Sequence, residues 1–282
     1  MSTTTATTSR AAPEAHGPGG LLAPGGPPRR AGPLAASAAF GWRAMLKIKH
    51  EPNQLTDVIA IPVVFTVLFT YIFGGAIGGT PGHYLTTLLP GTLVMGITAV
   101  TMYGGARLAQ DVTTGVFDRF RSLPIWRGAL VVGSLLGDAG RYLLAAAIVV
   151  ILGVIIGYRP DGGAPGVIAA VALVIAFGLS LSWVWAATAL LVRDPATVSS
   201  IGLAVLLPPT FASNIFVQPR TMPGWLQAFV KVNPISHLAD ATRDLMNNTG
   251  GAGGAVAWSL VATVAITLVF APLALHLYSK QA

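Results

Sequence analysis

The residues best suited to contacting another molecule lie in one charged segment, DVTTGVFDRFRSLPIWRGA, at residues 111–129. Only 10% of the chain is charged, yet this segment holds two aspartates and three arginines. Phe117, Phe120 and Leu123 recur every three residues, which places them roughly on one face of a short helix. Such an amphipathic helix suits a groove on a partner protein. The alternative, a solvated loop that carries positive charge, explains the arginines but leaves two phenylalanines in water.

Motifs for nucleotide binding or catalysis are missing from the sequence. A phosphate-binding loop needs Gly-Lys followed by Ser or Thr, and no lysine of this chain follows a glycine. There is no cysteine, no HExxH zinc motif and no GxSxG nucleophile elbow. The sequence therefore predicts that the chain is not an enzyme and that it holds no metal or cofactor itself.

The composition places the chain in a membrane. Its 282 residues are 53% hydrophobic and 10% charged, whereas a soluble domain carries about 25% charged residues. Crossing a hydrocarbon core takes roughly 20 apolar residues. Stretches free of charged residues occur at 58–74, 84–106, 142–158, 162–192, 195–219 and 245–279. The third is expected to begin near residue 130 and the last to span 256–277. We therefore predict an all-α, polytopic membrane protein with six transmembrane helices.

Lysine and arginine positions predict the orientation of these spans. With six spans both termini lie on one side, and that side would hold twelve basic residues against four on the other. Cytoplasmic loops carry the excess of basic residues, so both termini are expected inside. The net charge of +7 does not indicate nucleic-acid binding, because the basic residues are not gathered in one patch with stacking aromatics.

Charged residues within the predicted spans are few. Asp138 and Arg141 are three residues apart, so they share a helical face and can form an intramembrane pair. A neutralised pair that lets a polar face pack into the bundle is the simpler interpretation, and a role in transport is the alternative. An ion-coupled carrier would need acidic residues deep in its spans, and none is evident.

Three further segments flank or join the spans. Residues 1–34 are rich in Thr, Ala, Gly and Pro, and we expect a disordered cytoplasmic tail before a transmembrane domain at 35–282. As a helix, residues 40–50 would carry apolar side chains on one face and basic side chains on the other, which is typical of a helix that lies on the inner leaflet. The alternative is a plain extension of the first span. Residues 223–248 are expected to form two short extracellular interfacial or re-entrant helices, interrupted at Asn233-Pro234.

Three motifs together resemble the membrane subunits of type-2 ABC exporters, most of all the daunorubicin-resistance permeases of actinobacteria. The family's loop typically has an acidic residue, a glycine, a second acidic residue and Leu-Pro, matched here by Asp111, Gly115, Asp118 and Leu123-Pro124. The other two motifs are VVGSLLGDAGRYLL at 131–144 and MPGWLQAFVKVNPISHLADATRDLM at 222–246. The family often has Glu at both aspartate positions, and Thr where Val116 stands.

The resemblance implies an assembly around a two-fold axis. A second copy of this permease would complete the path, and two copies of a cytosolic ABC ATPase would bind ATP and Mg²⁺ beneath it. The charged segment from Asp111 to Pro124 would be the coupling helix seated in the ATPase groove. Its residues would be Asp111, Gly115, Phe117, Asp118, Arg119, Phe120, Arg121, Leu123 and Pro124.

The resemblance also implies a location and a cargo. The chain would lie in the bacterial cell membrane among lipids and move an amphipathic drug or lipid-like metabolite outward. Export of a polysaccharide or lipid-linked glycan by the same architecture is an alternative, and an ion-coupled carrier or membrane-embedded enzyme is a more distant one. The sequence does not identify the residues that contact the cargo, because these depend on the cavity between subunits.

Overall fold

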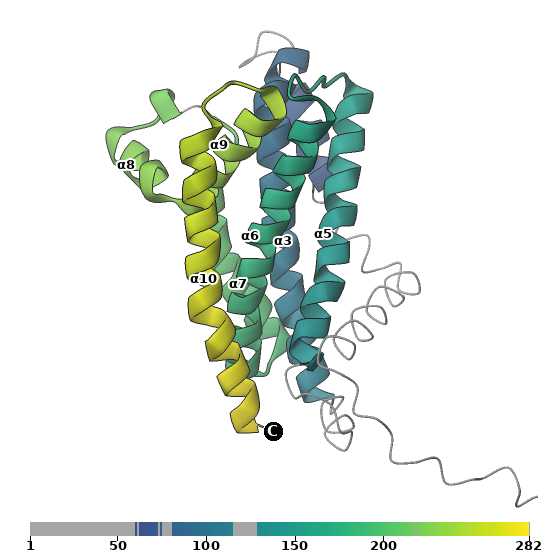
Figure 1. Cartoon of the computed structure of the whole chain (residues 1–282), viewed down its shortest axis with the longest axis vertical. Helices are drawn as coiled ribbons and strands as arrows, with labels where there is room; N and C mark the ends of the chain where they lie inside the picture. The colour runs from purple at the N-terminus through teal and green to yellow at the C-terminus, as the bar shows by residue number, and fades with distance from the viewer. Residues whose placement is uncertain are drawn as a thin grey trace, which may run out of the picture. The chain divides into compact units, whose positions relative to one another are not determined.

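The computed structural model describes residues 60, 62–72, 74, 81–114, 129–217 and 219–281. All regular elements in these ranges are helices (Figure 1). The predicted tail at 1–34, the predicted amphipathic helix at 40–50 and nearly all of the predicted coupling helix lie outside the described residues. The all-α prediction is confirmed for the part of the chain that is described.

Four helices in the described ranges are long and apolar enough to cross a membrane. They are α3 (Pro81–Thr113), α5 (Ala129–Ile156), α6 (Gly163–Val192) and α10 (Ala252–Gln281). The expected early start of the third span, near residue 130, agrees with the start of α5. Shorter apolar helices occur at Pro62–Ile72 and in α7 (Pro195–Phe211). Each of the six predicted apolar segments therefore contains a helix among its described residues, and the count of six spans stays a prediction.

Helix α7 ends before the predicted limit of residue 219. Its 17 residues extend about 26 Å, which is less than the roughly 30 Å of a hydrocarbon core. Pro208 and Pro209 stand in its last turn and a half and offer no backbone N–H, so two helical hydrogen bonds are missing there. Irregular backbone follows as far as residue 217.

Side-chain caps fix two helix boundaries. Asp194 accepts a hydrogen bond from the backbone N–H of Thr197 at 2.8 Å, at the start of α7. Hydrogen bonds from Thr197 lower the pKa of the Asp194 carboxyl. Asn233 caps α9 (Pro234–Asn247) by accepting from the N–H of Ile235 at 3.0 Å, immediately after α8 (Gly224–Val232) ends. The predicted division into two short helices at Asn233-Pro234 is confirmed.

Helix α3 is the central element of the bundle. It packs against α5, α6, α7 and α9, and 83% of its most apolar window is buried, against 11% for α10. In Figure 1, α10 and α5 lie on opposite sides of the bundle. Small residues permit this packing: a Cβ atom at Gly105 would lie 2.6 Å from the Cβ of Trp185, and one at Gly178 would lie 2.9 Å from Ile97.

The buried apolar side chains form two clusters along α3. The larger cluster includes α3 residues from Tyr84 to Val100 together with residues of α5, α6 and α9. The smaller cluster begins at Leu108 and Ala109 and joins α3 to Val131 and Leu135 of α5. Between the clusters, the indole N–H of Trp185 donates to the Thr101 hydroxyl at 2.9 Å. The core is thus interrupted by polar contacts near residues 101–107.

Candidate functional site

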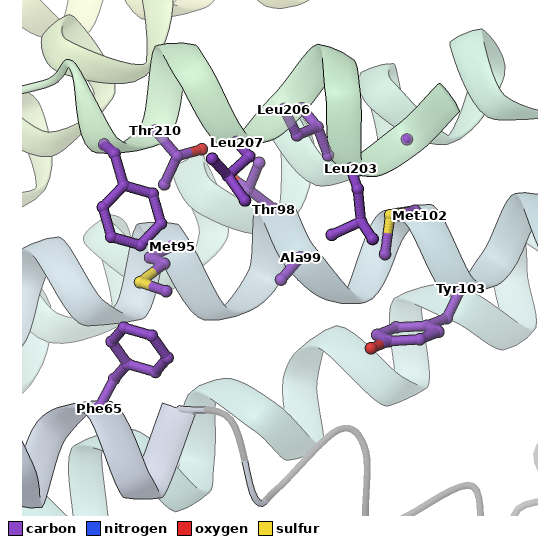
Figure 2. A pocket seen from close by; sticks show the side chains of 12 residues that line it. Phe65, Met95, Thr98, Ala99, Met102, Tyr103, Leu203, Leu206, Leu207 and Thr210 are labelled. Carbon is purple, nitrogen blue, oxygen red and sulfur yellow. The ribbon is translucent and has the colours of Figure 1, made fainter. Parts of the chain in front are cut away.

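A pocket of about 240 Å³ lies between α3, α7 and the Pro62–Ile72 helix (Figure 2). Figure 2 shows side chains of α3 and α7 converging on this space, with Phe65 on the third side. Its lining residues are Phe65, Met95, Thr98, Ala99, Met102, Tyr103, Gly202, Leu203, Leu206, Leu207, Thr210 and Phe211. We call this space the α3–α7 pocket.

The α3–α7 pocket is suited to an apolar molecule with a few polar groups. None of its lining residues is charged, and Thr98, Tyr103 and Thr210 contribute hydroxyl groups. Met95 and Met102 add flexible side chains that adapt to differently shaped partners. Pockets that enclose drug-sized ligands hold about 300–1,000 Å³, so this pocket by itself encloses only part of such a molecule.

One wall of the pocket continues onto the outside of α7. Leu203, Leu207 and Phe211 recur every four residues and are 53%, 51% and 48% exposed. A side chain at residue 202 of the same helix would clash with α3, because a Cβ atom at Gly202 would lie 2.2 Å from the Cγ of Met102. The absence of a side chain at Gly202 therefore allows α3 and α7 to approach while Met102 remains in the pocket wall.

Three charged residues meet beside α3, one turn beyond Tyr103: Arg107 of α3 and Asp138 and Arg141 of α5. We call them the ion cluster. Asp138 Oδ1 accepts hydrogen bonds from Arg141 at 2.7 Å and from Arg107 at 2.8 Å. The side chains of Asp138 and Arg141 are each 7% exposed, and that of Arg107 is 23% exposed. The structure thus brings the predicted pair together and adds an arginine that sequence reasoning assigned to the cytoplasmic side.

The α3–α7 pocket and the ion cluster both lie in a region that matches a known protein family. The ABC-2 type transporter family matches residues 37–247, which include the α3–α7 pocket and the ion cluster. The chain belongs to the ABC-2 type transporter family. The resemblance that the motifs indicated is therefore confirmed, and this ABC-2 permease is a multi-pass membrane protein that works with an ATPase subunit.

Two curated relatives agree with this assignment. The permease is 45% identical over 261 residues to the daunorubicin resistance ABC transporter permease protein of Streptomyces coeruleorubidus, covering 93% of this chain and 92% of the relative. It is 25% identical over 230 residues to the doxorubicin resistance ABC transporter permease protein of Mycobacterium tuberculosis, covering 78% of each chain. Both relatives carry names of drug-resistance permeases.

Of the nine residues named for the predicted coupling helix, the structure describes Asp111 alone. Asp111 is half-buried in the last turn of α3, four residues after Arg107 and therefore on the same side of that helix. The residues from Gly115 to Pro124 lie outside the described ranges. The central helix α3 therefore ends within the first residues of the predicted coupling segment.

A polar network that was not predicted from the sequence stabilises the segment that follows the C-terminal end of α7. Arg243 of α9 donates to the carbonyl oxygens of Thr87 at 3.0 Å and Asn214 at 2.5 Å, and to Asp240 at 3.0 Å. Asp240 also accepts from the side-chain amide of Asn214 at 2.6 Å. Because the network satisfies carbonyls in the irregular stretch after α7, we assign it a structural role. No signal in the sequence distinguished Arg243 from other basic residues near the predicted outer surface.

Proposed function

We propose that this permease moves an amphipathic drug or lipid-like metabolite out of the cell. The observation that carries the proposal is the α3–α7 pocket, whose apolar wall and three hydroxyl groups suit such a cargo. The names of the two relatives, which refer to daunorubicin and doxorubicin resistance, support the same class of cargo. A glycan would need polar partners along its length, and this lining offers few of them.

The pocket also supports a second copy of the permease in the assembly. Its volume is small for a drug-sized molecule, and the exposed residues Leu203, Leu207 and Phe211 extend its wall outward along α7. A second α7 facing this surface would enlarge the apolar enclosure and make it symmetric. We therefore place the cargo path at a homodimer interface that includes α7.

The energy for transport would come from two copies of a cytosolic ATPase that bind ATP and Mg²⁺. The permease holds no cofactor and catalyses no reaction in this proposal. Residues 111–124 would form the coupling helix, and α3 leads directly from that segment to the pocket. Asp138, the buried acid of α5, is hydrogen-bonded to two arginines, which argues against its use as a proton carrier.

The remaining topology follows from the same proposal. Six spans would place both termini in the cytoplasm of a bacterial cell, and α8 and α9 at the outer surface. Trp225, Phe229 and Val232 of α8 are exposed along one face of that helix, as expected for a helix that rests in the membrane interface among lipids.

Reconstituted transport tests the proposal. The permease and the ATPase encoded nearest to it are placed in proteoliposomes, and daunorubicin uptake and ATP hydrolysis are measured with and without the permease. We expect ATP-dependent uptake and drug-stimulated hydrolysis. Uptake driven by a proton gradient in vesicles depleted of ATP would instead identify an ion-coupled carrier and refute the proposal.

A further inference from the structure

The ion cluster links the helix that precedes the predicted coupling segment to the helix that follows it. Arg107 belongs to α3, which ends at Thr113, and Asp138 belongs to α5, which begins at Ala129. The Arg107–Asp138 ion pair therefore joins the two helices across residues 114–128. The Asp138–Arg141 pair lies within α5 and joins no second helix.

The position of the cluster along α3 is also specific. It lies at the boundary between the two apolar clusters, after Val100 and before Leu108. At Gly104 the two helices approach so closely that a Cβ atom would lie 2.5 Å from Asp138 Oδ2. The α5 carboxylate thus contacts α3 between the pocket residue Tyr103 and Arg107.

Stability alone is a weak explanation for this arrangement. A buried ion pair contributes little compared with well-packed apolar residues, because desolvation of both charges offsets their attraction. Its directional hydrogen bonds do, however, fix one relative position of the two helices. Arg141 bonds the same carboxylate oxygen from within α5 and so holds the Asp138 side chain in place for its contact with Arg107.

We propose that the Arg107–Asp138 pair makes α3 and α5 move as one unit, so that displacement of the coupling segment reaches the α3–α7 pocket. Arg107 and Asp138 are positioning residues that act through Met102 and Tyr103, which lie in the pocket wall one turn before Arg107 on α3. This inference rests on the proposed function, because it assumes an ATPase that displaces residues 111–124.

A matched pair of variants tests the proposal. Arg107→Gln removes the link between helices and leaves Asp138 neutralised by Arg141, whereas Arg141→Gln leaves the link and removes only the pair within α5. We expect Arg107→Gln to lower drug-stimulated ATP hydrolysis and transport by about tenfold, within the usual range of coupling between sites. Its affinity for daunorubicin should be unchanged, since the pocket residues are intact. Arg141→Gln should remain coupled, and Arg107→Lys should restore much of the loss.

The movement itself can be measured because the chain contains no cysteine. Gln110→Cys on α3 and Leu136→Cys on α5 place spin labels at two exposed positions. With the link intact, the distance between the labels should stay the same when ATP is added to the complex, and with Arg107→Gln it should change. A distance that changes on ATP addition with Arg107 present overturns the proposal, and this experiment does not depend on the stability of the Gln variant.

The outcomes separate this inference from the proposed function. If the wild-type complex transports no drug, the proposed function fails. If the wild-type complex transports drug and Arg107→Gln transports equally well, or Arg141→Gln loses as much as Arg107→Gln, the proposed function stands and the linking role of Arg107 is refuted.

Discussion

Substitution of Gly202 offers the sharpest test of the α3–α7 pocket. A Cβ atom at residue 202 would lie 2.2 Å from the Cγ of Met102 and 2.6 Å from its sulfur. Favourable contacts between such atoms are at about 3.5–4 Å, so in Gly202→Ala the Met102 side chain must move by about 1.5 Å or the helices must separate. A methionine side chain is flexible enough to move, and the open space beside it is the pocket.

The size of the effect follows from the volume available. The pocket holds about 240 Å³, and a Met102 side chain displaced into it removes part of the surface available to a cargo. A cargo that loses burial against one or two methylene-sized groups loses about 0.8 kcal/mol for each, and 1.4 kcal/mol corresponds to about tenfold in affinity. We therefore expect Gly202→Ala to bind daunorubicin about tenfold more weakly, measured by equilibrium dialysis against the purified permease in detergent.

The controls come from the same chain. Gly254→Ala in α10 has no neighbouring heavy atom within 4 Å of the added Cβ, so this variant should bind the drug as the wild type does. The double variant Gly202→Ala with Met102→Ala removes the atoms that clash and should recover part of the affinity. Wild-type affinity in Gly202→Ala would refute the assignment of the pocket, and so would a double variant with no recovery.

Three further predictions concern other parts of the permease. Asp118→Ala or Phe120→Ala should abolish transport and ATPase stimulation while the protein remains inserted in the membrane; normal export by both variants would contradict the coupling-helix assignment. Arg243→Lys should lower the thermal stability of the permease, because an ammonium group cannot reach the separate acceptors that the guanidinium bonds. Each buried carbonyl left without a hydrogen-bond donor lowers the free energy of unfolding by about 1–3 kcal/mol. An unchanged melting temperature would therefore contradict the structural role of Arg243. A spin label at Trp225→Cys should be accessible to membrane-dissolved oxygen, whereas one at Val230→Cys on the buried face of α8 should not.

The helices were largely predictable from the sequence, and their lengths were less so. Runs of uncharged residues located α3, α6, α10 and the C-terminal half of α5, because a charged side chain is costly in the hydrocarbon core. The limit of α7 was misplaced because absence of charge was the only criterion, and the helix ends at Phe211, two residues after Pro209, without any charged residue. A single proline does not mark such an end, since Pro90 lies inside α3 and Pro272 inside α10, whereas α7 carries two in succession.

The α3–α7 pocket could not be derived from the sequence. Its lining residues come from three separated stretches around Phe65, Met95–Tyr103 and Gly202–Phe211. Helices α3 and α7 are apolar on nearly every side, so no periodic pattern shows which face meets a neighbour and which faces lipid or cargo. Nothing in the sequence related Met95, Thr98 and Met102 of α3 to Leu203 or Phe211 of α7.

Arg107 shows why the positive-inside rule is an incomplete guide to single residues. The rule counts Arg107 among the basic residues of the predicted cytoplasmic side, but it gives no information on what the guanidinium binds. The structure shows that it donates to Asp138, a carboxylate that sequence spacing had already paired with Arg141. A carboxylate oxygen accepts more than one hydrogen bond, so finding one partner from spacing does not exclude another from a neighbouring helix. Because only the second partner joins α3 to α5, the contact that sequence spacing misses is the one that can carry movement between helices.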